Sequence, residues 1–204
     1  MVNGLSAAVL AGGRSSRMGI DKAFLRFNGR PFVQVIAEKL SSFSDDVMVI
    51  VGRKDPGPFR AVLPQKVRIL MDSVYTMSPI GGIMTAAMNS HHGYFAVIAT
   101  DMPLIDVEVI KRLRALADGH SAVVPVLKGK MEPLCSVYSS DALKTVDIND
   151  VKAVRDMVNL LPDAVFVDAE GFREIDPELS SFRNVNTTED YLKLNDSARK
   201  VIDL

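Results

Sequence analysis

The feature that most constrains the fold of this chain is a short apolar run that ends at two adjacent glycines. Leu5–Leu10 has the character of a buried strand, and Gly12 and Gly13 follow it almost at once. The residues after them carry three cations, Arg14, Arg17 and Lys22. Glycines let backbone N–H groups approach phosphate oxygens closely, and cations neutralise the phosphate charge. By itself the pattern fits either a polyphosphate-binding loop or a tight turn with solvated charges, and residues further along decide between them.

Two well-known phosphate loops do not fit this segment. The dinucleotide pattern G-x-G-x-x-G fails because Gly12 and Gly13 are adjacent and Arg14 follows them. The P-loop pattern G-x-x-x-x-G-K-[ST] fails because Ala23 follows Lys22 and no glycine directly precedes that lysine. The segment therefore predicts a third kind of nucleotide loop.

Apolar runs alternate with helical patterns along the first 120 residues. Strands are expected at Leu5–Leu10, Val47–Val51, Val67–Met71 and Tyr94–Ala99, with helices over Pro31–Phe43, Gly82–Asn89 and from Asp106 to Gly119. This βαβ repetition predicts an α/β fold, Rossmann-like and three-layered, with a mostly parallel sheet and helices on both faces.

The pattern changes after residue 120. Ala122–Leu127 and Leu134–Tyr138 flank Lys128-Gly129-Lys130, which predicts a hairpin-like excursion. The remaining expectations are a helix from Asn149 or Asp150, a strand at Val165–Asp168 and a last helix with a capping box at Thr187 and Asp190. Since there is no repeat and no long linker, we expect one domain over 1–204, with a nucleotide-binding half (1–120) and an acceptor-binding half (121–204).

Two carboxylates follow predicted strands. Asp72 comes directly after Val67–Met71, and Asp101 follows Tyr94–Ala99 with one residue between. A lone aspartate in such a place is usually a helix cap or a turn former. In a parallel sheet, however, both strands end at the edge that carries the glycine loop, where open α/β sheets bind ligands. The coincidence favours a phosphate site with acidic groups beside it.

These charges suggest metal-assisted nucleotidyl transfer. A nucleoside triphosphate arrives with Mg²⁺, which takes one or two protein carboxylates plus phosphate oxygens, and Asp101 is the expected ligand. Lys22 and Arg17 would hold the leaving pyrophosphate, while the Gly12 and Gly13 amides cradle the β- and γ-phosphates. An ionised phosphate monoester would attack the α-phosphorus in line, so no strong general base is needed.

Composition excludes several other classes. The chain of 204 residues is 48% hydrophobic, yet no apolar run approaches the length of a membrane span, and no signal peptide precedes the first strand. Its formal net charge of -1 gives no basic footprint for nucleic acid. The single cysteine, Cys135, fits a reducing cytoplasm and a core position beside Leu134, and the pair His91-His92 fits a solvated helix end better than a metal site.

Five segments in order along the chain resemble the molybdenum cofactor guanylyltransferase (MobA-like) family of nucleotidyltransferases. They are Leu10-Ala11-Gly12-Gly13-x-Ser15-x-Arg17-Met18-Gly19-x-Asp21-Lys22, Ser78-Pro79-Ile80-Gly81-Gly82, Thr100-Asp101-Met102-Pro103, Pro133-Leu134-x-x-x-Tyr138 and Asn184-Val185-Asn186-Thr187-Thr188-Glu189-Asp190. The first and third are specific for the superfamily and less so for the guanine-transferring member.

The resemblance implies GTP as substrate, Mg²⁺ as cofactor and molybdopterin carrying molybdenum as phosphate acceptor, with pyrophosphate released. It assigns nucleotide binding to Leu10, Ala11, Gly12, Lys22, Asp72 and Asp101, the last holding Mg²⁺. It also implies transient contact with other proteins of cofactor biosynthesis. Two departures concern the base: Gly52 precedes Arg53 where the family often has Asn, and Gly81-Gly82 adds a glycine, and with it backbone freedom, where backbone groups are placed to read the base edge.

Three alternatives stay open. A relative that uses CTP or another phosphorylated acceptor would keep the same loop. A non-catalytic GTP-binding protein is disfavoured because Lys22 and Asp101 are both present. An NAD-dependent oxidoreductase is disfavoured because Gly52 and Arg53 stand where a ribose-binding acid belongs. For the acceptor, the candidate cations are Lys128, Lys130, Arg155 and Arg183.

Overall fold

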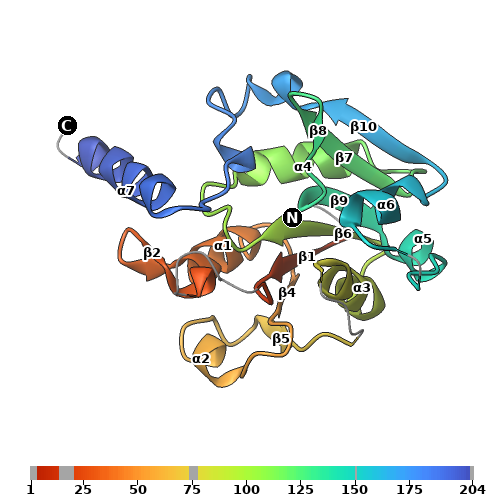
Figure 1. Ribbon diagram of the computed structural model, residues 1–204, viewed down its shortest axis with the longest axis horizontal. Coiled ribbons are helices and arrows are strands. Elements are labelled where there is room, and N and C mark those ends of the chain that lie inside the picture. Colours follow the sequence, from red (N-terminus) through yellow and green to blue (C-terminus); the bar gives the residue numbers. More distant parts are fainter. Residues whose placement is uncertain (1–3, 14–20, 74–77, 150, 203–204) are drawn as a thin grey trace.

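The computed structural model of the chain describes residues 4–13, 21–73, 78–149 and 151–202 (Figure 1). Its main sheet has eight strands in the order β10-β7-β9-β6-β1-β4-β5, with β8 paired to β7. The strands are β1 Leu5–Leu10, β4 Asp46–Ile50, β5 Arg68–Leu70, β6 Tyr94–Ala99, β7 Ala122–Leu127, β8 Lys130–Met131, β9 Cys135–Ser139 and β10 Ala164–Asp168. A separate hairpin joins β2 Arg26–Phe27 to β3 Arg30–Pro31.

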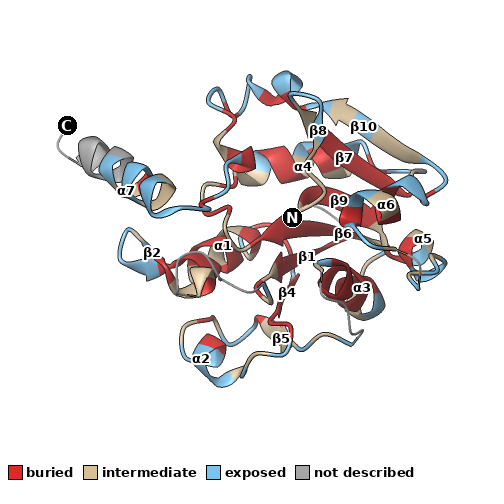
Figure 2. Cartoon of the chain, viewed as in Figure 1, coloured by how far each residue is buried: buried red, intermediate tan, exposed pale blue. Residues whose placement is uncertain are grey.

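Helices cover both faces of the sheet. They are α1 Phe32–Leu40, α2 Gly57–Arg60, α3 Ile80–Asn89, α4 Val107–Ala115, α5 Ser140–Lys144, α6 Val154–Asn159 and α7 Thr188–Ile202, with 3-10 turns η1 Lys22–Phe24, η2 Ala169–Phe172 and η3 Ser180–Phe182. Residues of α1 and α4 share one apolar core, and residues of α3, α5 and α6 share the other. Figure 2 shows the buried layer running through the central strands between them.

Strand alternation divides the side chains between these two cores. In β4, Val47 and Val49 belong to the α1–α4 core, while Met48 and Ile50 belong to the α3–α5–α6 core. A strand that is apolar on both faces has to lie inside a sheet covered on both sides. The predicted α/β three-layer architecture is confirmed.

The strands around the predicted site are parallel and end together. Leu10 of β1 is paired with Ile50 of β4 and Ala99 of β6, and Ile50 is paired with Leu70 of β5. The carboxyl ends of β6, β1, β4 and β5 therefore form one edge. β9 runs antiparallel to both of its neighbours, β6 and β7, so the sheet is mixed in the second half of the chain.

Three local predictions needed correction. The helix expected from Asn149 or Asp150 begins at Val154, because Val151 is held in a turn by Ile148 and the Asp156 carboxylate accepts a hydrogen bond from the Ala153 amide; Asp150 itself lies outside the described residues. The helix expected to run to Gly119 ends at Ala115. The hairpin-like excursion between Ala122–Leu127 and Leu134–Tyr138 is confirmed, but it contains an additional short strand, β8, which pairs antiparallel with β7 before the chain continues into β9.

The C-terminal segment returns to the first half of the chain. Val185 and Leu194 pack in a small core with Leu25 and Phe32, next to the β2–β3 hairpin. From there α7 extends beyond the body of the molecule (Figure 1). Among the described residues, no helix combines the length and apolar character needed to cross a bilayer.

Candidate active site

The glycine loop leaves the sheet in close contact with the neighbouring turn. The Ala11 amide donates to the Ile50 carbonyl at 2.8 Å, which continues the β1–β4 pairing by one residue. Gly12 then touches the backbone of Gly52, which has a positive φ of 67°. Gly52 is the residue that departs from the family pattern, and here it supplies close backbone packing instead of a side chain.

Lys22 and Asp101 meet at the carboxyl edge of the sheet. The Lys22 Nζ lies 2.9 Å from Asp101 Oδ2, although the two residues are 79 positions apart. Their side chains are 18% and 19% exposed, so the pair is shielded but still reaches solvent. The structure therefore brings together two of the three predicted catalytic residues. Arg17, the third, lies outside the described residues.

Asn186 completes this group, and sequence reasoning did not single it out. Its Oδ1 accepts a hydrogen bond from the Lys22 Nζ at 2.7 Å. The Val185 amide donates to the Asp101 carbonyl at 2.8 Å, which fixes the segment beside the end of β6. The available signal was the Asn-Thr-x-Glu-Asp tail, which carries Asn186 next to a helix start.

A capping box holds Asn186 in place. The Asp190 carboxylate accepts hydrogen bonds from the amides of Asn186 at 3.0 Å and Thr187 at 2.8 Å, and Thr187 Oγ1 accepts one from the Asp190 amide. These bonds, chiefly those with Thr187, lower the pKa of Asp190 below its ordinary value. The predicted capping box is confirmed, and it positions a polar side chain of the site.

The segment after Asp101 is anchored by a lysine from α1. Lys39 donates to the carbonyls of Pro103 at 3.1 Å and Ile105 at 2.9 Å. Burial lowers the pKa of this lysine, while the charges of Asp106 and Asp176 oppose the shift. The half-buried Lys39 ammonium, bonded to two backbone carbonyls, thus holds the turn that follows Asp101.

Asp72 occupies the same edge but a different part of it. Its amide donates to the Gly52 carbonyl at 2.9 Å, and the Ser73 amide donates to Thr85 Oγ1 of α3 at 2.9 Å. Burial raises the pKa of Asp72, and the charge of Arg53 opposes that shift. Because β1 and β4 lie between β6 and β5, Asp72 stands roughly 14 Å from Asp101 along the edge, too far for one metal ion to bind both.

The two glycines predicted to read the base belong to a helix. Gly81 and Gly82 are buried in the first turn of α3, and the Thr85 hydroxyl donates to the Gly81 carbonyl. A Cβ on Gly82 would lie 3.1 Å from Leu10 Cδ2. The expectation of extra backbone freedom at this position is therefore wrong, because helix geometry and the contact with Leu10 constrain the backbone there. Reading of the base by these residues stays a prediction.

The oxygen atoms near Lys22 suit a hard divalent cation. Within the described ranges, no three His, Cys, Asp or Glu side chains lie close enough to form a metal cage. Mg²⁺ does not need one, because it binds one or two carboxylates and completes its shell with phosphate oxygens and water. Asp101 supplies such a carboxylate in a partly shielded position beside the glycine loop. The residues present fit a magnesium–triphosphate complex.

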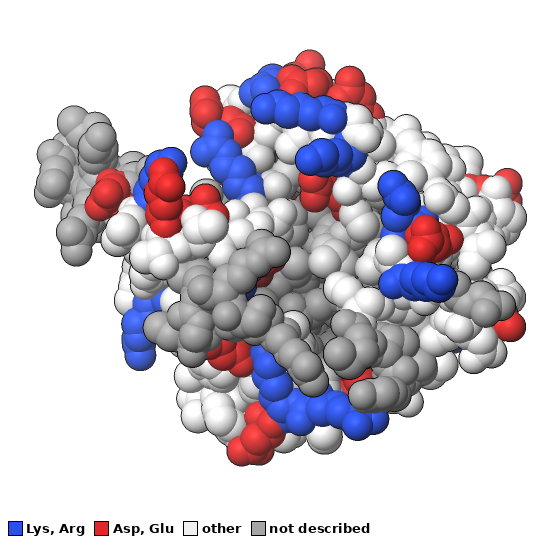
Figure 3. Space-filling view, viewed as in Figure 1, with Lys and Arg blue, Asp and Glu red and all other residues white. Residues whose placement is uncertain are grey.

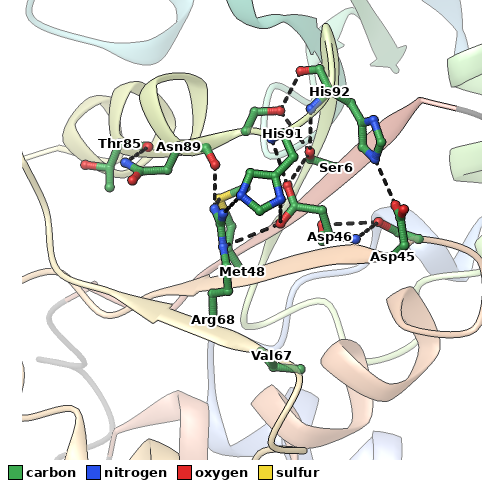
Figure 4. Close-up of polar contacts among 12 residues, drawn as sticks. Ser6, Asp45, Asp46, Met48, Val67, Arg68, Thr85, Asn89, His91 and His92 are labelled. Atoms are coloured by element: carbon green, nitrogen blue, oxygen red, sulfur yellow. Dashed lines mark hydrogen bonds and ion pairs between the residues drawn. The ribbon is translucent and has the colours of Figure 1, made fainter.

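A second polar cluster lies at the amino-terminal ends of β1, β4 and β5, away from the carboxyl ends that carry the candidate site (Figure 4). The buried Asp46 carboxylate accepts hydrogen bonds from the Ser6 hydroxyl at 2.5 Å and the His91 amide at 3.0 Å, and it faces Arg68. The His92 ring is directed at Asp45 instead. The two imidazoles approach different carboxylates, as expected of adjacent residues, and the cluster ties β1, β4 and β5 to the end of α3.

The other predicted residues have ordinary surroundings. Cys135 is fully buried, burial raises the pKa of its thiol, and its core role is confirmed. Of the acceptor candidates, Lys128, Lys130 and Arg155 are exposed, and Arg183 pairs with Glu178 of its own loop. Figure 3 shows cations and anions intermixed on the face that it presents.

Comparison with known proteins decides the family. Residues 7–163 match the MobA-like NTP transferase domain. The chain belongs to this family. It is therefore a nucleotidyltransferase, and the resemblance seen in its motifs is confirmed.

Individual relatives agree over nearly the whole chain. A probable molybdenum cofactor guanylyltransferase of Methanothermobacter thermautotrophicus is 37% identical, over 91% of this chain and 96% of its own length. One from Methanosarcina acetivorans is 35% identical, over 91% and 87%. The crystal structure of molybdopterin-guanine dinucleotide biosynthesis protein A from Archaeoglobus fulgidus superposes with a TM-score of 0.80 at 26% identity, over 96% of this chain and 99% of that one.

Proposed function

We propose that this chain transfers GMP from GTP to the phosphate of molybdenum-carrying molybdopterin and releases pyrophosphate, in molybdenum cofactor biosynthesis. The names of its relatives support this reaction. The observation that carries it is the meeting of Lys22, Asp101 and Asn186 beside the glycine loop. This is a cation, a metal-binding acid and a neutral hydrogen-bonding group at one edge.

The residues divide the work by charge. Lys22 stabilises the negative charge that develops on the leaving pyrophosphate, together with Arg17. The amides of Gly12 and Gly13 donate to the β- and γ-phosphates, and Leu10 and Ala11 line the nucleotide. Asp101 would hold Mg²⁺, and the bound ion would supply positive charge that offsets the charge of the phosphates.

The Lys22–Asp101 ion pair also sets the order of contacts. Before the nucleotide binds, Asp101 neutralises the Lys22 ammonium group. The amide oxygen of Asn186 holds the same ammonium group without neutralising its charge. In the nucleotide complex Lys22 would donate to a phosphate oxygen while Asn186 still accepts a hydrogen bond from its ammonium group. Asp72, about 14 Å along the edge, serves the other end of the nucleotide.

The acceptor needs little chemical activation. A phosphate monoester is ionised near neutral pH, so its oxygen attacks the α-phosphorus once it is positioned in line. The exposed cations Lys128, Lys130 and Arg155 are the proposed contacts for its charge. We place the reaction in the cytoplasm, in a single domain over 1–204 that contacts other proteins of cofactor biosynthesis transiently.

Incubation with Mg²⁺, molybdopterin and one triphosphate at a time tests the reaction. Mass analysis should find the GMP adduct with GTP and little product with CTP or ATP. Turnover with CTP alone would replace the guanylyl assignment with a cytidylyl one. Tight GTP binding without pyrophosphate release would favour a non-catalytic GTP-binding protein.

A substitution tests the role of the acid. Asp101→Asn should lower kcat by about 100-fold or more, because the amide is a poor ligand for Mg²⁺. Asp118→Asn is the matched control, because Asp118 is exposed just after α4 and forms an ion pair with Arg114 of that helix. Activity of the Asp101 variant equal to that of the control would contradict the proposed mechanism.

A further inference from the structure

Lys54 contacts both ends of the glycine-rich loop. Its Nζ donates to the Ala11 carbonyl at 2.5 Å and forms an ion pair with Asp21 Oδ2 at 2.7 Å. Ala11 is the first residue after β1, and Asp21 directly precedes η1. One ammonium group therefore joins the residue that precedes Gly12 to the residue that precedes Lys22.

The turn that carries Lys54 is itself fixed against this loop. The Lys54 amide donates to the Val51 carbonyl at 3.2 Å, which closes a turn over residues 51–54. Gly52 within this turn has a positive φ and packs against the Gly12 backbone. Lys54 thus extends from a base that already touches the start of the loop.

Asp21 passes this restraint on to a predicted catalytic residue. Its second carboxylate oxygen, Oδ1, accepts a hydrogen bond from the Ala23 amide at 3.1 Å and caps η1, which begins with Lys22. The carboxylate that Lys54 holds therefore also orients the backbone of the lysine that meets Asp101.

We propose that Lys54 is a positioning residue, which fixes both ends of the glycine-rich loop in advance and so increases affinity for the nucleoside triphosphate. The inference rests on the proposed function, because it assumes that the loop binds phosphates. The Lys54 and Asp21 side chains are 27% and 29% exposed, and ion pairs that reach solvent contribute little to stability. The pair instead benefits binding, because Ala11 and Asp21 are already held in position before the nucleotide arrives, and preorganisation of this kind increases affinity.

Equilibrium binding of GTP with Mg²⁺ tests the proposal through Lys54→Met and Asp21→Asn. Lys54→Met should raise the Kd about tenfold, because Ala11 and Asp21 then lose their common partner and binding must position them. In turnover assays the KM should rise while kcat stays within about twofold of the wild-type value, because Lys54 aids binding without touching the reacting atoms. Asp21→Asn should raise the Kd as well, since it removes the charge but keeps an oxygen that can cap Ala23.

The double variant separates positioning from unrelated damage. Lys54→Met with Asp21→Asn should bind no more weakly than Lys54→Met alone, because both substitutions remove the same ion pair. Lys66→Met is the control. Lys66 lies two residues before β5, at the amino-terminal end of that strand, and donates to the Ser41 carbonyl at the end of α1. Its loss should not change the Kd.

Two results would overturn the proposal. One is a Lys54→Met protein that binds GTP like the wild type, and the other is a double variant whose loss is the sum of the single losses. Failure of the proposed function is a distinct outcome, in which the wild type itself binds no triphosphate and Lys22→Met changes nothing.

Discussion

Gly12 and Gly52 lie so close that neither has room for a side chain. A Cβ on Gly12 would stand 2.8 Å from the Cα of Gly52, and a Cβ on Gly52 would stand 2.9 Å from the Cα of Gly12. Real Cβ atoms essentially never approach backbone atoms this closely. The loops that follow β1 and β4 therefore pack backbone against backbone at these two glycines.

Replacing Gly52 with alanine should separate these two loops. The new Cβ would clash with Gly12 and would stand on a residue with a positive φ of 67°. We therefore expect the free energy of unfolding to fall by about 2 kcal/mol and GTP binding to weaken. Chemical denaturation and equilibrium binding measure the two effects. Gly93→Ala is the control, because nothing lies within 4 Å of its added Cβ and no positive φ is present. A Gly52 variant as stable as this control would show that the loops tolerate separation.

Loss of the Asn186 amide should weaken catalysis more than folding. Asn186→Ala removes the hydrogen bond to Lys22 but leaves Asp101 as its partner, so we expect kcat/KM to fall about tenfold, the order expected of a lost bond to a charged group. Asn159→Ala, at an exposed position of α6, supplies the comparison. Melting temperatures of both variants should stay near the wild-type value. An unchanged kcat/KM in Asn186→Ala would remove this residue from the site.

Asp72 should give a pH-dependent stability difference. Burial raises its folded-state pKa above the unfolded value, so ionised Asp72 opposes folding, and this cost appears as the pH rises through the unfolded pKa towards the folded one. At lower pH both states are protonated and the cost vanishes. Asp72→Asn should therefore be more stable than wild type at neutral pH and equally stable in acid, while binding GTP less well. Melting temperatures across roughly pH 3–8 measure the difference. A gain that persists unchanged at the acid end would contradict this prediction.

The Asp46 cluster should matter for stability and not for nucleotide binding. Asp46→Asn leaves Arg68 without its buried carboxylate and disturbs the bonds to Ser6 and His91, so we expect a loss of about 2–4 kcal/mol. Asp45→Asn, at the exposed neighbouring position, should leave the melting temperature unchanged. Urea denaturation measures both variants, and GTP affinity serves as the functional check. Equal stability of the two would contradict a structural role for the Asp46 cluster.

The sequence predicted the central sheet well because its strands are unbroken apolar runs. The strands Leu5–Leu10, Tyr94–Ala99 and Ala122–Leu127 have the bounds that were expected. Short elements were missed, because α5 has five residues and α2 four, too few for a helical repeat to emerge. The β2–β3 hairpin was also missed, although Asn28-Gly29, both with positive φ, is a common turn signal.

Within the candidate site, the position of a residue could be predicted where that residue directly follows a strand. Asp101 follows β6, and parallel pairing carries it towards the glycine loop. Asn186 and Lys54 were missed because each reaches the site only through tertiary contacts, and polar residues near helix starts and turns usually act as local caps. The catalytic role of Lys22, Asp101 and Arg17 stays a prediction until activity is measured.

The capping box at Thr187 and Asp190 has a consequence for how this enzyme is made. Asn186 arrives at Lys22 across 164 residues, and it is held there by the first turn of the last helix. Synthesis must therefore reach at least Asp190 before Asn186 can be held beside Lys22. Nascent chains that already contain all the described strands should bind nucleotide more weakly until the first turn of α7 has formed.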